Sequence, residues 1–183
     1  CEHEEVRLKR RLYRLRDDKG CIQRSRKGEG GLWRRADREL YREILKNSRY
    51  LYFLAPRQSG KSSLISHIRK KLDETIFKSV FIDLSTFPAN TLQSENAFNE
   101  YIVNTIYSAF NYEEELENKR DLKKVLEKIV KMEDKRILMF VDEIDRILHA
   151  NFKDSWFGLI RSFFNCRASE PGLEFGKLQF ILS

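Results

Sequence analysis

Between residues 50 and 73 the chain reads as three consecutive segments of different character. The apolar run YLYFLA (50–55) indicates a buried strand, and KSSLISHIRKKLD (61–73) has the spacing of an amphipathic helix. The turn between them gives the sequence APRQSGKS over residues 55–62. It matches the phosphate-binding pattern GxxxxGK[ST] except at the first position, where Ala55 replaces glycine. With strand and helix on either side, the match indicates an α/β fold with an anion site at the strand-to-helix turn.

The chemistry of this turn suits a nucleotide phosphate. Backbone N–H groups of the turn and of the helix N-terminus point at one spot. Gly60 permits a backbone conformation that a side chain would obstruct. Lys61 can reach the β- and γ-phosphates, and Ser62 offers a hydroxyl to Mg²⁺. The candidate nucleotide-binding residues here are Pro56, Arg57, Gln58, Ser59, Gly60, Lys61, Ser62 and Ser63.

A second candidate site follows the apolar run ILMFV, which ends in Asp142 and Glu143. At the tip of a buried strand, Asp142 can hold Mg²⁺ beside Ser62, and Glu143 can orient the attacking water as general base. The alternative is that both carboxylates only cap the next helix, IDRIL. Asp145 fits that capping role better than a catalytic one.

Three further polar residues are weaker candidates. Arg161 and Arg167 lie on or just after the helix expected at 154–166, and either could supply a cation to the transition state of a neighbouring subunit or be a surface charge. Ser183, at the tip of the strand expected at 177–183, is placed to sense the γ-phosphate.

The sequence NKRD at 118–121 resembles the guanine-reading motif NKxD. That motif requires a loop after a strand, downstream of the metal-binding strand. Here it lies in a charged helical stretch upstream of Asp142, so we expect a solvated helix face and favour ATP over GTP.

Period and composition organise the rest of the chain. Further strands are expected at 79–84, 136–143 and 177–183, alternating with long helices, which favours a parallel sheet covered on both faces.

Residues 1–50 hold sixteen basic and nine acidic residues and so carry the whole net charge of +7. We therefore divide the chain into a basic extension and linker (1–32) and a C-terminally incomplete domain (33–183). The extension can serve nucleic acid, a membrane surface or an acidic partner, or be merely solvated.

Several classes of protein are excluded. No apolar run exceeds six residues, against the roughly 20 that span a bilayer, and the N-terminus lacks the apolar core of a signal peptide. Three cysteines at unrelated spacings give neither a disulfide framework nor a metal pattern. We expect a cytoplasmic protein with free thiols and no membrane contact.

Taken together, five segments resemble the AAA-like domain of the STAND-type P-loop ATPases: RxADRELYREIL (34–45), YFLAPRQSGKSSL, FIDLS, ILMFVDEIDRIL and FGLIRSF. The resemblance implies a three-layer α/β sandwich of the additional-strand type with sheet order 5-1-4-3-2. In this chain the fifth strand and the helical lid are expected to be missing. It also implies that Asp37 borders the adenine pocket, and that alanine in the first loop position is no mark against activity.

The function implied is an ATP-dependent regulatory switch in a larger signalling or defence protein. Mg²⁺-dependent ATP binding and slow hydrolysis would use Lys61, Glu143 and Arg161 as catalytic groups and Ser62 and Asp142 as metal ligands. The expected partners are ATP, further copies of the domain, and an effector or repeat domain elsewhere in the protein. Two alternatives stay open: a nucleic-acid motor or loader that uses the basic extension, and a scaffold that binds nucleotide without cleaving it.

Overall fold

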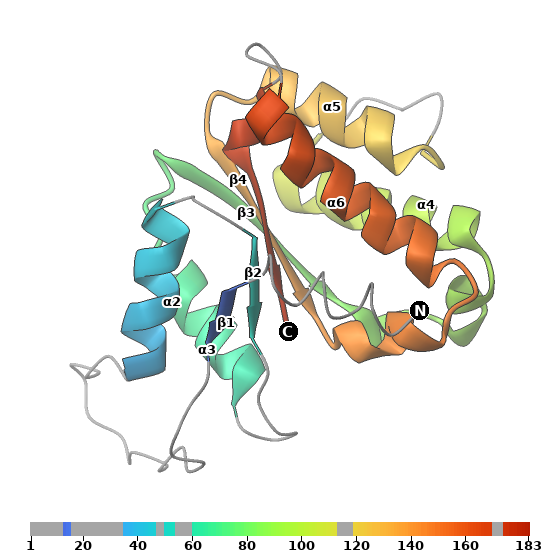
Figure 1. The fold of residues 1–183 in the computed structure, drawn as a ribbon, viewed down its shortest axis with the longest axis horizontal. Coiled ribbons are helices and arrows are strands. Elements are labelled where there is room, and N and C mark those ends of the chain that lie inside the picture. The colour runs from blue at the N-terminus through green and yellow to red at the C-terminus, as the bar shows by residue number, and fades with distance from the viewer. Residues whose placement is uncertain (1–12, 16–34, 47–49, 54–59, 113–118, 170–173) are drawn as a thin grey trace.

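A computed structural model describes residues 13–15, 35–46, 50–53, 60–112, 119–169 and 174–183. A parallel sheet forms the middle layer, with α2 (Arg35–Lys46) and α3 (Lys61–Arg69) on one face. The other face carries α4 (Glu95–Phe110), α5 (Leu122–Met132) and α6 (Lys153–Ser169), as Figure 1 shows. The expected three-layer α/β sandwich is thereby confirmed.

The sheet has the order β1-β2-β5-β4-β3, with every neighbouring pair parallel. Its strands are β1 (Tyr13–Leu15), β2 (Leu51–Phe53), β3 (Phe77–Asp83), β4 (Arg136–Asp142) and β5 (Leu178–Leu182). The four strands expected from the sequence take the order 1-4-3-2, as the resemblance implies.

One feature of the sheet differs from the expectation. The strand beside β2 was expected to be missing, but the basic N-terminal segment supplies β1 at that edge. Residues 13–15 pair with residues 51–53, from Tyr13 opposite Leu51 to Leu15 opposite Phe53. An open strand edge carries unpaired backbone N–H and C=O groups, and β1 gives those of β2 a partner. With only three residues, YRL, the strand is too short to show a period that would predict it.

Both faces of the sheet are buried, which explains the apolar runs in its strands. In β4, the six residues from Ile137 to Asp142 are all buried. On the α4–α5–α6 face the core includes Phe98, Trp156 and Phe163, and on the α2–α3 face it includes Leu40, Ile65 and Phe140. Trp156 is 1% exposed and belongs to the first of these cores.

Short 3-10 helices make several of the connections: η1 (Leu84–Thr86), η2 (Ala89–Gln93), η3 (Ile144–His149) and η4 (Glu174–Lys177). The IDRIL segment, expected as a helix, is thus the 3-10 helix η3.

Asp121 of the NKRD segment caps α5 by accepting a hydrogen bond from the Lys124 N–H at 3.1 Å. Within the described ranges, no helix is both long and apolar enough to cross a bilayer.

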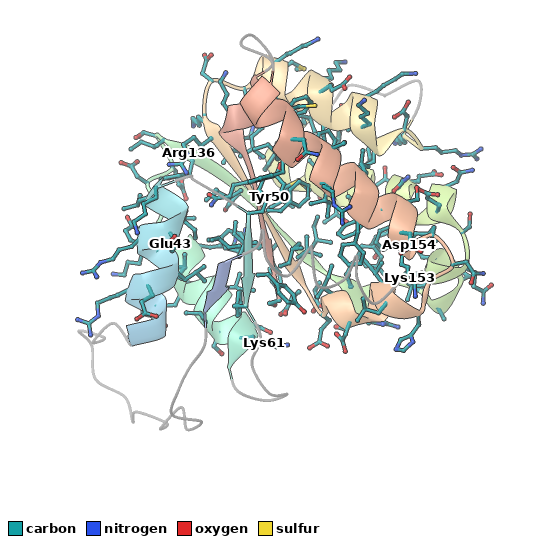
Figure 2. The ribbon with its side chains drawn as sticks, in the orientation of Figure 1. Glu43, Tyr50, Lys61, Arg136, Lys153 and Asp154 are labelled. Carbon is teal, nitrogen blue, oxygen red and sulfur yellow. The ribbon has the colours of Figure 1, made fainter. Side chains whose placement is uncertain are left out.

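Arg136 fixes α2 against the sheet (Figure 2). Its guanidinium donates to the carbonyl oxygens of Ile44 and Leu45, in the last turn of the helix, where a cation also complements the helix dipole. The Arg136 side chain lies over the ring of Phe77, 4.8 Å from its centroid. Because α2 carries Asp37 and packs beside α3, these contacts of Arg136 also hold Asp37 in place next to α3.

Candidate functional site

The candidate residues meet at the carboxyl edge of the sheet. Parallel strands end at the same edge, and in this fold class ligands bind there. Asp83 at the end of β3 is in register with Asp142 at the end of β4. Ser183, directly after β5, donates its backbone N–H to Val141 at 2.9 Å and accepts one from Ile144 at 2.9 Å. The ends of three neighbouring strands are therefore locked together.

Asp142 is the centre of this cluster and is 1% exposed. The Ser62 hydroxyl, from the first turn of α3, donates to its Oδ2 at 2.6 Å. The Ser183 hydroxyl and the Glu143 backbone N–H both donate to its Oδ1, the latter at 3.0 Å. The structure thus brings together the two residues that the sequence assigned to a metal, and places Ser183 against the same carboxylate.

The oxygen atoms of Ser62 and Asp142 suit Mg²⁺, which prefers hard oxygen ligands and keeps several positions for water or phosphate. No group of three or more His, Cys, Asp and Glu side chains in the described part of the chain could hold a metal by itself.

Gly60 and Lys61 begin α3. Gly60 caps the helix with φ of 87°, a left-handed conformation that glycine adopts at no steric cost, and its carbonyl accepts the Leu64 N–H at 2.9 Å. Lys61 follows as the first helical residue, half-buried, at the end of α3 near the carboxyl end of β2 (Figure 2). The other loop candidates, Pro56, Arg57, Gln58 and Ser59, lie outside the described residues.

Glu143 adopts a left-handed backbone conformation, with φ of 58° and ψ of 44°. Such a conformation is uncommon for a residue other than glycine, asparagine or aspartate, and at functional sites it often sets the direction of a side chain. Here it separates β4 from η3, and Glu143 is half-exposed whereas Asp142 is buried. The sequence did not predict this turn, because glutamate carries no signal for it.

Asp37 and His67 form a contact between α2 and α3. The Asp37 side chain is 1% exposed, and its Oδ2 lies 3.6 Å from Nδ1 of His67, which is 30% exposed. His67 lines an open groove of about 740 Å³ along α3, together with Ser62, Ser63, Ser66, Lys70 and Lys71. Asp37, expected to border the adenine pocket, lies behind His67 rather than among the lining residues. No sequence motif joins these two residues, since their contact depends on how the two helices pack.

The arginine candidates are not part of this cluster. Arg161 is half-buried on α6, which covers the face of the sheet opposite α3 (Figure 1). The side chain of Arg167 lies outside the described residues. Arg146, which lies in no motif of the sequence, joins the segment after β4 to the segment after β3.

In this parallel sheet, Gly60-Lys61-Ser62 at the start of α3 face Asp142 at the end of β4, two strands away from β2. This arrangement defines an α/β P-loop NTPase fold. The AAA-like domain family model matches residues 32–183, and the chain belongs to that family.

The relatives agree with this fold. An uncharacterized WD repeat-containing protein of Synechocystis sp. is 29% identical over 164 residues, covering 81% of this chain but 13% of the relative. Two structures of the Aeropyrum pernix ORC2 protein, its ADPNP-ADP complexes and its ADP form, superpose with TM-scores of 0.52 and 0.53 at 15% identity. Each superposition covers 80% of this chain and 39% of the ORC2 chain. The chain thus spans a minor part of each of these proteins.

Proposed function

We propose that this chain binds ATP with Mg²⁺ and cleaves it slowly, and that the cycle serves as a conformational switch. The observation that carries the proposal is the 2.6 Å hydrogen bond between Ser62 and Asp142, which puts the two proposed metal ligands side by side at the start of α3. The two ORC2 structures are an ADP form and ADPNP-ADP complexes, which supports an adenine nucleotide as the ligand here.

Phosphate binding falls to the N-terminus of α3. Its first backbone N–H groups have no partner within the helix and attract an anion, helped by the helix dipole. Lys61 adds a full positive charge at the first helical position. Ser62 and Asp142 would hold Mg²⁺, which supplies neutralisation of the phosphate charge when bound. Pro56, Arg57, Gln58, Ser59 and Ser63 complete the proposed phosphate-binding loop.

Cleavage falls to Glu143. Its backbone is left-handed, and the residue is half-exposed, so its carboxylate is accessible to a water molecule. A carboxylate in that place accepts a proton from the attacking water. Ser183 donates to Asp142 Oδ1 and fixes the orientation of that carboxylate. A cation from Arg161 requires a second copy of the chain, because α6 lies on the far face of the sheet.

The switch role rests on context. The Synechocystis relative extends far beyond the matched segment and by its name carries WD repeats. This supports a STAND-type arrangement, in which residues 33–183 form the nucleotide-controlled part of a larger cytoplasmic regulatory protein. Self-association through this domain and release of an effector or repeat domain are the proposed outputs.

Equilibrium binding of fluorescent ATP, ADP and GTP analogues tests the proposal, with Mg²⁺ or with EDTA. We expect ATP to bind more tightly than GTP, and Mg²⁺ to strengthen ATP binding. Lys61→Ala should weaken ATP binding about tenfold or more, since it removes a charge-assisted contact to phosphate. Lys131→Ala, on exposed α5 surface, is the matched control and should bind as the wild type does. Equal binding by both variants, or binding indifferent to Mg²⁺, would contradict the proposal.

A further inference from the structure

Arg146, in η3, bridges two segments that leave the sheet at its carboxyl edge. Its Nη1 donates to the Leu84 carbonyl at 2.6 Å and to the Ser85 carbonyl at 2.8 Å. Both acceptors belong to η1, the segment that follows β3. A guanidinium makes such charge-assisted bonds in a fixed planar geometry, so it restrains the direction of η3 as well as its distance from η1.

The segment that Arg146 grips is itself fixed. The Asp83 carboxylate accepts the Ser85 N–H at 2.8 Å, and the Thr86 hydroxyl donates to the Asp83 carbonyl at 2.7 Å. Asp83 in turn pairs in register with Asp142 of the neighbouring strand. The acceptor carbonyls therefore have a set position relative to the end of β4, where the site begins.

Arg146 also closes the turn at Glu143. Its backbone N–H donates to the Glu143 carbonyl at 3.1 Å, so one residue contacts Glu143 through its main chain and η1 through its side chain. Glu143 holds a left-handed conformation that glutamate adopts rarely. Such a conformation persists only where surrounding contacts impose it.

From these contacts we infer that Arg146 is a positioning residue for Glu143: by clamping η3 to η1 it holds the left-handed turn that aims the Glu143 carboxylate. The inference rests on the proposed function for its effect on ATP cleavage, but not for its effect on the turn. Among the described residues, the hydrogen bonds that Arg146 donates go to η1 and to Glu143, so its loss should affect cleavage and not binding.

The test compares Arg146→Ala and Arg146→Lys with the wild type in three measurements: ATP-analogue affinity, single-turnover cleavage, and hydrogen exchange of the backbone amides at 143–147 in the nucleotide-free chain. We expect Arg146→Ala to keep its affinity for the ATP analogue within about twofold of the wild type and to cleave ATP about tenfold or more slowly. Its amide exchange should speed up, relative to the wild type, more at 143–147 than elsewhere in the chain. Arg146→Lys keeps the positive charge but lacks the planar guanidinium, so its values should fall between those of the wild type and of Arg146→Ala. Arg42→Ala, an exposed arginine on α2, is the matched control and should change none of the three.

A double-mutant cycle with Glu143→Gln separates positioning from a general bracing role. If Arg146 acts through Glu143, adding Arg146→Ala to Glu143→Gln should slow residual cleavage no further, whereas independent effects multiply. Wild-type cleavage by Arg146→Ala, or affinity, cleavage and melting temperature falling in parallel, would overturn the inference. If the wild type itself cleaves no ATP, the proposed function fails, and amide exchange alone decides: unchanged exchange at 143–147 overturns the positioning role.

Discussion

The hydroxyl of Ser62 donates to the carboxylate of Asp142 over 2.6 Å, although 80 residues separate the two in the chain. The contact joins the first turn of α3 to the end of β4. It exists because α3 lies in the connection from β2 to β3, which has to cross β5 and β4 in the sheet. Two separate sequence motifs thereby become one site.

Replacing Asp142 by asparagine tests the metal-ligand role of this pair. The amide has nearly the shape of the carboxylate but lacks its charge, and Mg²⁺ relies on carboxylate ligands. We expect Asp142→Asn to lose the Mg²⁺-dependent part of ATP binding, so that its affinity in Mg²⁺ falls about tenfold, to the value in EDTA. Titrations of an ATP analogue with and without Mg²⁺ measure this. An Asp142→Asn variant that still gains affinity from Mg²⁺ would rule out Asp142 as a ligand.

The stability of the chain should depend on the residues of β4 that pack in the core between the sheet and α2 and α3. Phe140 is 0% exposed, and truncating such a residue removes its buried surface and leaves a cavity. We expect Phe140→Ala to lower the free energy of unfolding by about 3–5 kcal/mol. Met132→Ala, at a position 53% exposed, should change it by less than about 0.5 kcal/mol. Urea unfolding of both variants decides the point, and comparable losses would show that the packing described for β4 is wrong.

Much of the fold was predictable because it rests on local period. The run at 136–143 indicated β4, and the helical spacing at 154–166 indicated α6, each within a few residues of its observed bounds. The order of the predicted strands followed from the family resemblance. The strand β1 was not predictable, since it is stabilised by pairing with an edge and not by its own pattern.

The site was predictable only in part. Ser62 and Asp142 each stood out in a motif, because the residue types and their spacing from a strand carry the signal. The left-handed turn at Glu143, the bridge from Arg146 and the contact of Asp37 with His67 depend on tertiary packing, which one sequence does not reveal. The roles assigned to Lys61, Glu143 and Arg161 stay predictions.

A network at the opposite edge of the sheet makes stability depend on pH. Lys78 Nζ lies 2.5 Å from Oε1 of Glu133, and the Tyr112 hydroxyl donates to the same oxygen. Burial acts to raise the pKa of Glu133, but the hydrogen bonds from Lys78 and Tyr112 outweigh it and hold that pKa below the usual 4.5. A lowered pKa means that the folded chain favours the carboxylate, so its contribution is present above pH 4.5 and is lost as the pH falls through the lowered pKa.

Glu133→Gln therefore should lower the free energy of unfolding by about 1–3 kcal/mol at pH 7. The difference from the wild type should shrink as the pH falls below 4.5. Urea titrations of both chains at a series of pH values measure it. A difference that stays constant down to the lowest pH would show that the Glu133 charge contributes nothing.

His67 should influence nucleotide affinity, because it lines the groove that begins at Ser62. Loss of one polar contact corresponds to roughly a two- to tenfold weaker affinity, which we expect for His67→Ala. Asp37→Asn should show a smaller effect in the same direction, since Asp37 contacts His67 but does not itself line the groove. Binding titrations with Lys131→Ala as control check both, and a larger effect at Asp37 than at His67 would mean that Asp37 contacts the nucleotide directly.

Single-turnover cleavage of ATP, with the wild type beside Glu143→Gln, tests the central claim most directly. General-base catalysis contributes about 10²–10⁴-fold, so the variant should bind ATP as tightly as the wild type and cleave it slower by a factor in that range. Cleavage at the same rate by both chains, or no cleavage by either while both bind, would contradict the account. The second result would leave a scaffold that binds nucleotide without using it.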